Sequence, residues 1–155
     1  MQEYLLKKIL NNNQMTIKQL SIFLENKSGR LTEVMETLGK EKINITAMTI
    51  ADTSDYGILR MIVSNPDKAH QILKTKGFSV NLAEVLSVAT PIQAGSFAKV
   101  LRIFSDEHIS IEYMYAFSMD KKAMMVFRTE NTKDALEAIL KHKMELVKGS
   151  DLYEL

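Results

Sequence analysis

The feature that most constrains the fold of this chain is an internal repeat. Comparing the 155-residue sequence with itself at an offset of 66 residues aligns Gly29 with Gly95 and Asn65 with Asn131, without a gap. Further matches at this offset are Leu20-Ser21 with Leu86-Ser87, Val34 with Val100, Glu41 with Glu107, Ile43 and Ile45 with Ile109 and Ile111, Met48 with Met114, and Ala69 with Ala135. Such self-similarity indicates one structural unit built twice.

Both copies show the same succession of periodic segments. Each opens with an apolar run typical of a strand, followed by a stripe at helical spacing: Leu31, Val34, Met35 and Leu38 in the first copy, and Phe97, Val100, Leu101 and Phe104 in the second. Two strand-like segments follow, at 43–51 and 56–64 and again at 109–119 and 122–129. Asn65 and Asn131 then precede a second helical stripe as N-cap residues, and short strands at 78–82 and 144–147 close the copies.

The order strand, helix, strand, strand, helix, strand predicts an α+β fold. Two helices must cover one face of a four-stranded antiparallel sheet, which is a ferredoxin-like βαββαβ unit occurring twice. We expect an N-terminal extension at 1–14, a first domain at 15–82 and a second at 83–155. Residues 78–90 contain no linker composition, so the last strand of one unit is expected to lead directly into the next unit.

Residues 1–14 leave two interpretations open. Leu5, Leu6, Ile9 and Leu10 have helical spacing, so this stretch could be an amphipathic arm that docks on a partner. The three asparagines at 11–13 continue a helix poorly, and Met15 could be the working start. A loose extension is the favoured interpretation.

Composition argues against several classes of protein. The formal net charge is +1 with both signs interspersed, which gives no indication of nucleic-acid or membrane partners. The chain has no cysteine, so it has no disulfide, thiolate nucleophile or cysteine-ligated zinc. No apolar run reaches the roughly 18 residues of a membrane span, and the first residues do not resemble a secretory signal. We expect a cytoplasmic protein.

No catalytic or cofactor signature is present. The sequence lacks phosphate-binding, dinucleotide-binding and zinc-protease motifs. His70, His108 and His142 have no second ligand at helical spacing, so no metal site is expected. The third strands lack the glycine-aromatic signature of the RNA-binding module that shares this order of elements. We therefore expect a protein that is not an enzyme and needs no cofactor.

The loop after the first strand is the best candidate site. It precedes a helix whose first N–H groups have no partner within the helix and favour an anion such as a carboxylate. Gly29 allows close approach of a ligand and a positive φ, while Asn26 and Ser28 offer side-chain hydrogen bonds. Alternatively, these residues only start the helix and make a turn. The chemistry of the loop alone does not separate the two interpretations.

A family resemblance favours the first interpretation. The stretches "LENKSGRLTEVMETLGKEKINITAM" and "ATPIQAGSFAKVLRIFSDEHISIEYMYAF" resemble two copies of the ACT domain, a regulatory module that binds small molecules. The likeness runs from Thr16 to Leu155. It implies an amino acid ligand held where two domains meet, by the loop of one domain and by the second strand of its neighbour.

Carried over to this sequence, the resemblance names specific residues. The implied ligand-binding residues are Asn26, Ser28, Gly29, Arg30 and Leu31 in the loop and helix start, Asn44, Ile45 and Thr46 opposite them, and Gly95 in the second copy. Ile92 stands where Asn26 stands and Ser110 where Asn44 stands. The resemblance therefore leaves a separate site in the second copy open.

The implied function is amino acid binding reported to a partner. The alternatives are an interaction module with an empty loop, or a regulatory subunit of a separate enzyme of amino acid metabolism with no ligand site of its own.

We also expect a homodimer. The matched pair Met48 and Met114 assigns one face of the second strands to the helix-covered core, which leaves Tyr113, Tyr115 and Phe117 on the open face, joined by Met124 and Val126. Such an apolar patch is expected to pack against a second chain. If the faces are swapped, these aromatic residues are ordinary core residues.

Overall fold

The computed structural model describes residues 3–4, 7, 15–52 and 55–153. Apart from residues 3, 4 and 7, the expected extension at 1–14 lies outside the described residues, and so do Thr53 and Ser54 of the expected turn. The chain divides into two compact units, each of which is described by itself. Among the described residues, no helix is long and apolar enough to cross a membrane.

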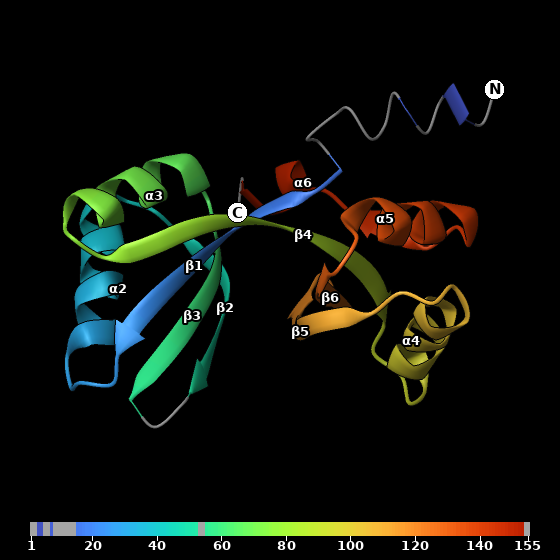
Figure 1. Ribbon diagram of the computed structural model, residues 1–155, viewed down its shortest axis with the longest axis horizontal. Helices are drawn as coiled ribbons and strands as arrows, with labels where there is room; N and C mark the ends of the chain where they lie inside the picture. The colour runs from blue at the N-terminus through green and yellow to red at the C-terminus, as the bar shows by residue number, and fades with distance from the viewer. Residues whose placement is uncertain (1–2, 5–6, 8–14, 53–54, 154–155) are drawn as a thin grey trace. The chain divides into compact units, whose positions relative to one another are not determined.

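The first unit comprises residues 18–83 and residues from 150 onward. Its elements are β1 (Ile17–Glu25), α2 (Arg30–Lys40), β2 (Ile45–Asp52), β3 (Tyr56–Val63), α3 (Pro66–Thr75) and the start of β4 (Ser79–Pro91). The strand order is β2-β3-β1-β4, with β3 antiparallel to both of its neighbours. Helices α2 and α3 lie on one side of this sheet (Figure 1).

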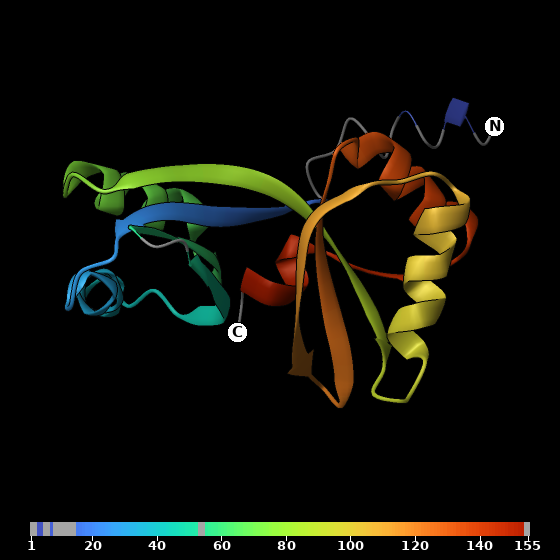
Figure 2. The same cartoon turned by 60° about the horizontal axis from the view of Figure 1, so that its bottom comes forward.

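The second unit, built from residues 84–149 together with the chain up to Ile17, repeats the arrangement, and Met15 packs against its core. Its elements are the end of β4, then α4 (Ser96–Asp106), β5 (Ile111–Met119), β6 (Lys122–Thr129), α5 (Thr132–Lys141) and β7 (Glu145–Val147). Strand β4 pairs with β6 and β7, and β6 pairs with β5, all antiparallel. Helices α4 and α5 lie on the same side of these strands (Figure 2). The predicted pair of ferredoxin-like units is confirmed, with β4 serving as last strand of one and first strand of the other.

The predicted asparagine caps explain where α3 and α5 begin. The side-chain oxygen of Asn65 accepts the backbone N–H of Lys68 at 3.2 Å. Asn131 accepts the backbone N–H of Asp134 at 3.1 Å in the same way. Each bond satisfies one of the N–H groups that the first turn of a helix leaves without a partner.

Each unit has its own apolar core between its sheet and its two helices. In the first, Val34 and Leu38 of α2 pack with strand residues such as Leu20 and Met61, all fully buried. In the second, Phe104 of α4 meets Phe127 of β6 edge to face, with ring centroids 4.9 Å apart. The helical stripes of the sequence are therefore the faces that close the two cores.

The assignment of faces on β5 is also confirmed. Met114 lies opposite Phe127 and packs against the helix-side core, whereas Tyr115 and Phe117 lie opposite Val126 and Met124 on the other face. The expectation that Met124 and Val126 belong to an open apolar patch is wrong, because Met124 is 4% exposed and Val126 is fully buried within the single chain. The expectation that Met48 belongs to the helix-covered core is confirmed only in part. Met48 lies opposite Met61 on the helix side, but it is 44% exposed because β2 is an edge strand that the helices do not cover.

A short C-terminal helix, α6 (Gly149–Tyr153), was not predicted from the sequence. From residue 150 onward the chain groups with the first unit. Leu152 is fully buried and its carbonyl accepts the hydroxyl of Thr46 at 3.2 Å. The Tyr153 hydroxyl oxygen accepts the backbone N–H of Lys18 at 2.7 Å, and burial raises the pKa of Tyr153. Five residues are too few for a helical period to be recognised in the sequence.

Leu152→Ala is expected to destabilise the protein by about 2–5 kcal/mol, because it removes a fully buried leucine side chain and leaves a cavity. Ser150→Ala, two residues earlier at an exposed position of the same helix, is the matched control and should change stability by less than about 0.5 kcal/mol. Urea denaturation followed by circular dichroism measures both. Equal stability of the two variants would mean that α6 does not pack as described.

Candidate functional site

Both predicted loops place a glycine in the left-handed region immediately before a helix. Gly29 has φ of 89° and ψ of −14°, and Gly95 has φ of 86° and ψ of −7°. No heavy atom would lie within 4 Å of a Cβ added at either position, so glycine is required there by backbone conformation and not by crowding. The positive φ expected at Gly29 is confirmed, and Gly95 has the same conformation.

These glycines also leave the starts of α2 and α4 open. Neither helix has a side-chain cap, unlike α3 and α5. In the second unit the N–H of Ser96 donates to the carbonyl of Gln93 at 3.1 Å, and the N–H of Lys99 donates to Gly95 at 3.1 Å. The N–H groups of Phe97 and Ala98 come between them and have no acceptor four residues earlier within the helix. An anion at this helix start would be stabilised by both the N–H groups and the helix dipole.

In the first unit, the loop is surrounded by charged side chains. Lys27 pairs with Glu25 at 2.9 Å, and its hydrogen bond holds the pKa of Glu25 below the ordinary value. Arg30 pairs with Glu33 at 2.8 Å, and its guanidinium lies 4.7 Å from the ring centroid of Phe78. The side chain of Arg30 is therefore engaged with its own helix and with Phe78.

The remaining predicted residues of this loop are accessible. Asn26 and Ser28 are exposed, Leu31 is 36% exposed, and the backbone N–H of Asn26 donates to the carbonyl of Asp55 at 3.0 Å. That bond fixes the loop beside the turn between β2 and β3.

The second predicted group lies at the other end of the sheet. Asn44 exchanges hydrogen bonds with Ser64, at 3.0 Å and 2.9 Å, where β2 begins. The loop lies beside the end of β2, which is roughly 23 Å further along the strand at about 3.3 Å per residue. Ile45 packs against the core, and the hydroxyl of Thr46 binds α6. The structure therefore does not bring the two groups together within the first unit.

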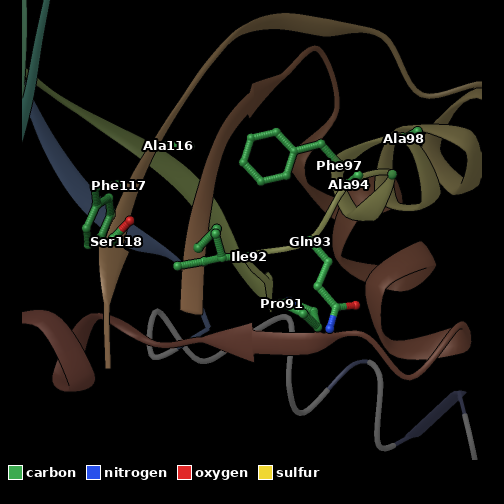
Figure 3. A pocket seen from close by; sticks show the side chains of 11 residues that line it. Pro91, Ile92, Gln93, Ala94, Phe97, Ala98, Ala116, Phe117 and Ser118 are labelled. Carbon is green, nitrogen blue, oxygen red and sulfur yellow. The ribbon is translucent and has the colours of Figure 1, made fainter. Parts of the chain in front are cut away.

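The second unit contains a cavity of about 530 Å³ beside Gly95. Its lining residues come from the loop after β4, the start of α4, the end of β5 and the start of β6: Pro91, Ile92, Gln93, Ala94, Gly95, Phe97, Ala98, Ala116, Phe117, Ser118 and Ala123. Figure 3 shows Phe97 from α4 and Ile92 from the loop extending toward the strand that carries Ala116 and Phe117. We call this cavity the Gly95 pocket; none of its eleven lining residues carries a charge.

Small residues on two strands make room for this pocket. Ala116 and Ala123 stand at the repeat positions of Ile50 and Gly57. In the first unit, a Cβ added at Gly57 would lie 3.4 Å from Cδ1 and Cγ1 of Ile50, so the isoleucine occupies the space over that glycine. With alanine at both positions, the second unit leaves the corresponding volume open.

Of the eleven residues that line the pocket, only Gly95 is among the ligand-binding residues expected from the sequence. The replacement of Asn26 by Ile92 had left a separate site in the second copy open. The signal that could have revealed the pocket was the replacement of Ile50 by Ala116, which is visible in the repeat alignment at the same offset. The site expected from the sequence rested on polar side chains, whereas this pocket depends on missing side-chain volume.

A second cavity, of about 420 Å³, lies at the other end of β5. It is lined by His108, Ile109, Ser110, Glu130, Asn131 and Asp134. Ser110 stands at the position of Asn44, so the arrangement of the first unit recurs, with the two candidate regions at opposite ends of the sheet. Among the described residues, no group of three or more His, Cys, Asp or Glu side chains could hold a metal ion.

Comparison with known proteins adds the following. A family model described as an ACT domain pair matches residues 15–155. A crystal structure of a protein from Bacteroides thetaiotaomicron is 50% identical, covers 93% of this chain and 100% of its own, and has a TM-score of 0.88. The regulatory subunit of aspartate kinase from Thermus thermophilus, in its ligand-free form, is 14% identical over 80% of this chain and 91% of its own, with a TM-score of 0.60.

The corresponding subunit from Thermus flavus is 15% identical over 80% of this chain and 90% of its own, with a TM-score of 0.56. At this level of identity, the two Thermus structures are similar in fold alone. No curated protein matches the chain.

Gly29→Ala and Gly95→Ala are each expected to cost about 1–2 kcal/mol of stability, because alanine is strained in the left-handed region. The corresponding asparagine variants should cost less, since asparagine tolerates this conformation. Gly39→Ala is the control for the same change of residue. Gly39 lies inside α2 with open space around it, so alanine should stabilise there by about 0.5–1 kcal/mol. Urea denaturation measures all five variants, and three alanine effects of the same sign would contradict the assigned backbone geometry.

Proposed function

Because the chain belongs to the family of ACT domain pairs, we propose that it is a non-catalytic regulatory protein that binds an amino acid. The observation that carries this proposal is the Gly95 pocket, a cavity of ligand size at an uncapped helix start. A cytoplasmic location is part of the same proposal.

The geometry suits the two ends of an amino acid. The α-carboxylate is proposed to lie at the N-terminus of α4, where the N–H groups of Phe97 and Ala98 are available and the dipole favours negative charge. The side chain of the ligand then extends into the cavity along Ala116. Gln93 and Ser118 carry the polar side chains of the lining and are placed to orient the ligand.

The first unit is proposed to contribute a second, more polar site around Asn26, Ser28, Gly29, Arg30 and Leu31. Asn44, Ile45 and Thr46 lie at the other end of their own sheet, so any contact they make with a ligand at such a loop comes from a different domain. A site of this kind is completed only when two domains meet, which links its occupancy to assembly.

The regulatory effect is proposed to be linkage. A ligand that binds one assembly more tightly than another shifts the equilibrium between them by its difference in affinity, typically about 1–3 kcal/mol. The protein is proposed to pass this shift on to a separate partner protein, because the function of such a module lies in its binding equilibria.

A homodimer is part of the proposal. Tyr113, Tyr115 and Phe117 lie on the helix-free face of β5 and are half-buried within a single chain. Tyrosine suits a protein interface because its ring is buried while its hydroxyl finds a hydrogen-bond partner. We propose that the same face of a second copy packs here about a two-fold axis.

At least one of the twenty standard amino acids is expected to raise the melting temperature by roughly 5–10 °C when present at about 100 times its dissociation constant. A ligand that binds only the folded state adds about 2.7 kcal/mol under these conditions. Differential scanning calorimetry at millimolar amino acid is the measurement. A flat response to all twenty would favour an interaction module without a ligand.

Tyr115→Glu is expected to convert a dimer into a folded monomer, because a carboxylate buried without a partner at an interface is costly. Sedimentation velocity measures the assembly, and circular dichroism measures the fold. Gln71→Glu adds the same charge on an exposed position of α3 and should leave the dimer intact. A wild-type protein that sediments as a monomer would eliminate the proposed interface.

A further inference from the structure

We propose that the Gly95 pocket selects amino acids with a large apolar side chain, and that Ala116 sets the size it accepts. This inference rests on the proposed function, since it names the class of amino acid that the pocket binds. Its basis is the chemistry of the pocket lining and the contrast with the first unit.

The lining excludes charged side chains. All eleven residues of the pocket are uncharged, and the side chains of only two of them, Gln93 and Ser118, are polar. A lysine, arginine, aspartate or glutamate ligand would lose hydration of its side-chain charge without meeting an opposite charge, which is strongly unfavourable. The loop of the first unit is the opposite case, with Glu25, Lys27 and Arg30 in ion pairs around it.

The rim of the pocket presents apolar surface that a ligand would cover. Ile92 is 61% exposed and Phe97 is 39% exposed, and both border the cavity. Figure 3 shows both side chains extending over the space between α4 and β5. Removing such surface from water favours an apolar occupant in proportion to the area covered.

Ala116 determines how much volume is left. It is an exposed residue of edge strand β5, opposite Met125, just as Ile50 of edge strand β2 lies opposite Leu59. At this position in the first unit, the larger isoleucine side chain lies over Gly57. The first unit therefore shows that this register accommodates isoleucine in an intact sheet, where a β-branched residue is favourable.

The experiment is isothermal titration calorimetry of the full chain with single amino acids. L-Leucine, L-isoleucine, L-methionine and L-phenylalanine are compared with L-alanine, L-serine, L-lysine and L-glutamate. We expect the wild type to bind at least one of the first four more than ten-fold more tightly than any of the second four, because each methylene buried in an apolar pocket changes affinity by about ten-fold or more.

Variants then test the role of Ala116. Ala116→Val should weaken binding of the preferred amino acid, and Ala116→Ile should weaken it further, by more than ten-fold. Both variants should also shift the preference toward smaller apolar side chains, which a general loss of structure would not do. Ile50→Ala makes the reverse change at the matched position of the first unit and should alter this affinity by less than two-fold.

Three outcomes overturn the inference in different ways. Tightest binding of L-lysine, L-glutamate or L-serine would leave the proposed function intact and refute the apolar selectivity. Unchanged affinity and unchanged preference in both Ala116 variants would show that the binding site lies away from Ala116. No heat from any of these eight amino acids would overturn the selectivity, and a flat melting response to all twenty would overturn the proposed function as well.

Discussion

The left-handed glycine at the junction of strand and helix is the constraint on which both candidate sites depend. In each unit, one helix begins after an asparagine whose side chain caps it, and the other begins after a glycine, which has no side chain to form a cap. The capped helices, α3 and α5, satisfy one of their first N–H groups internally. The uncapped helices, α2 and α4, have no such side-chain bond, and their first N–H groups lie at one end of the sheet. The residue that precedes each helix therefore decides whether a side chain caps its first turn.

The two repeats keep this backbone and diverge in side-chain chemistry. Gly29 and Gly95 have nearly the same φ and ψ, yet one loop is flanked by ion pairs and the other by an uncharged cavity. Duplication allows such divergence, because one copy can maintain the original contacts while the other changes. The exchange of Ile50 for Ala116 changes the volume beside the helix start without altering strand pairing.

Much of the fold could be predicted because its signals are local and occur twice. The stripes of α2 and α4, the caps at Asn65 and Asn131 and the side of β5 that carries Met114 all follow from spacing and from the repeat. The exposure of Met48 did not, because the sequence does not show that β2 is an edge strand. Helix α6 was missed because five residues carry no period. The Gly95 pocket was missed because an empty volume is defined by side chains from four segments, of which only the loop had been recognised as a candidate site.

The position of α6 has a consequence for how this chain becomes folded. The first unit is assembled from residues 18–83 and from those after residue 149, and residues 84–149 of the second unit lie between these two parts in the sequence. During synthesis residues 18–83 emerge before the second half of the chain, yet the contacts of Leu152 and Tyr153 with the first unit cannot form until residues 152 and 153 have been translated. The first unit is therefore completed only after residues 84–149 of the second unit have been translated. The two units are therefore completed together during synthesis, even though the sequence consists of two successive repeats.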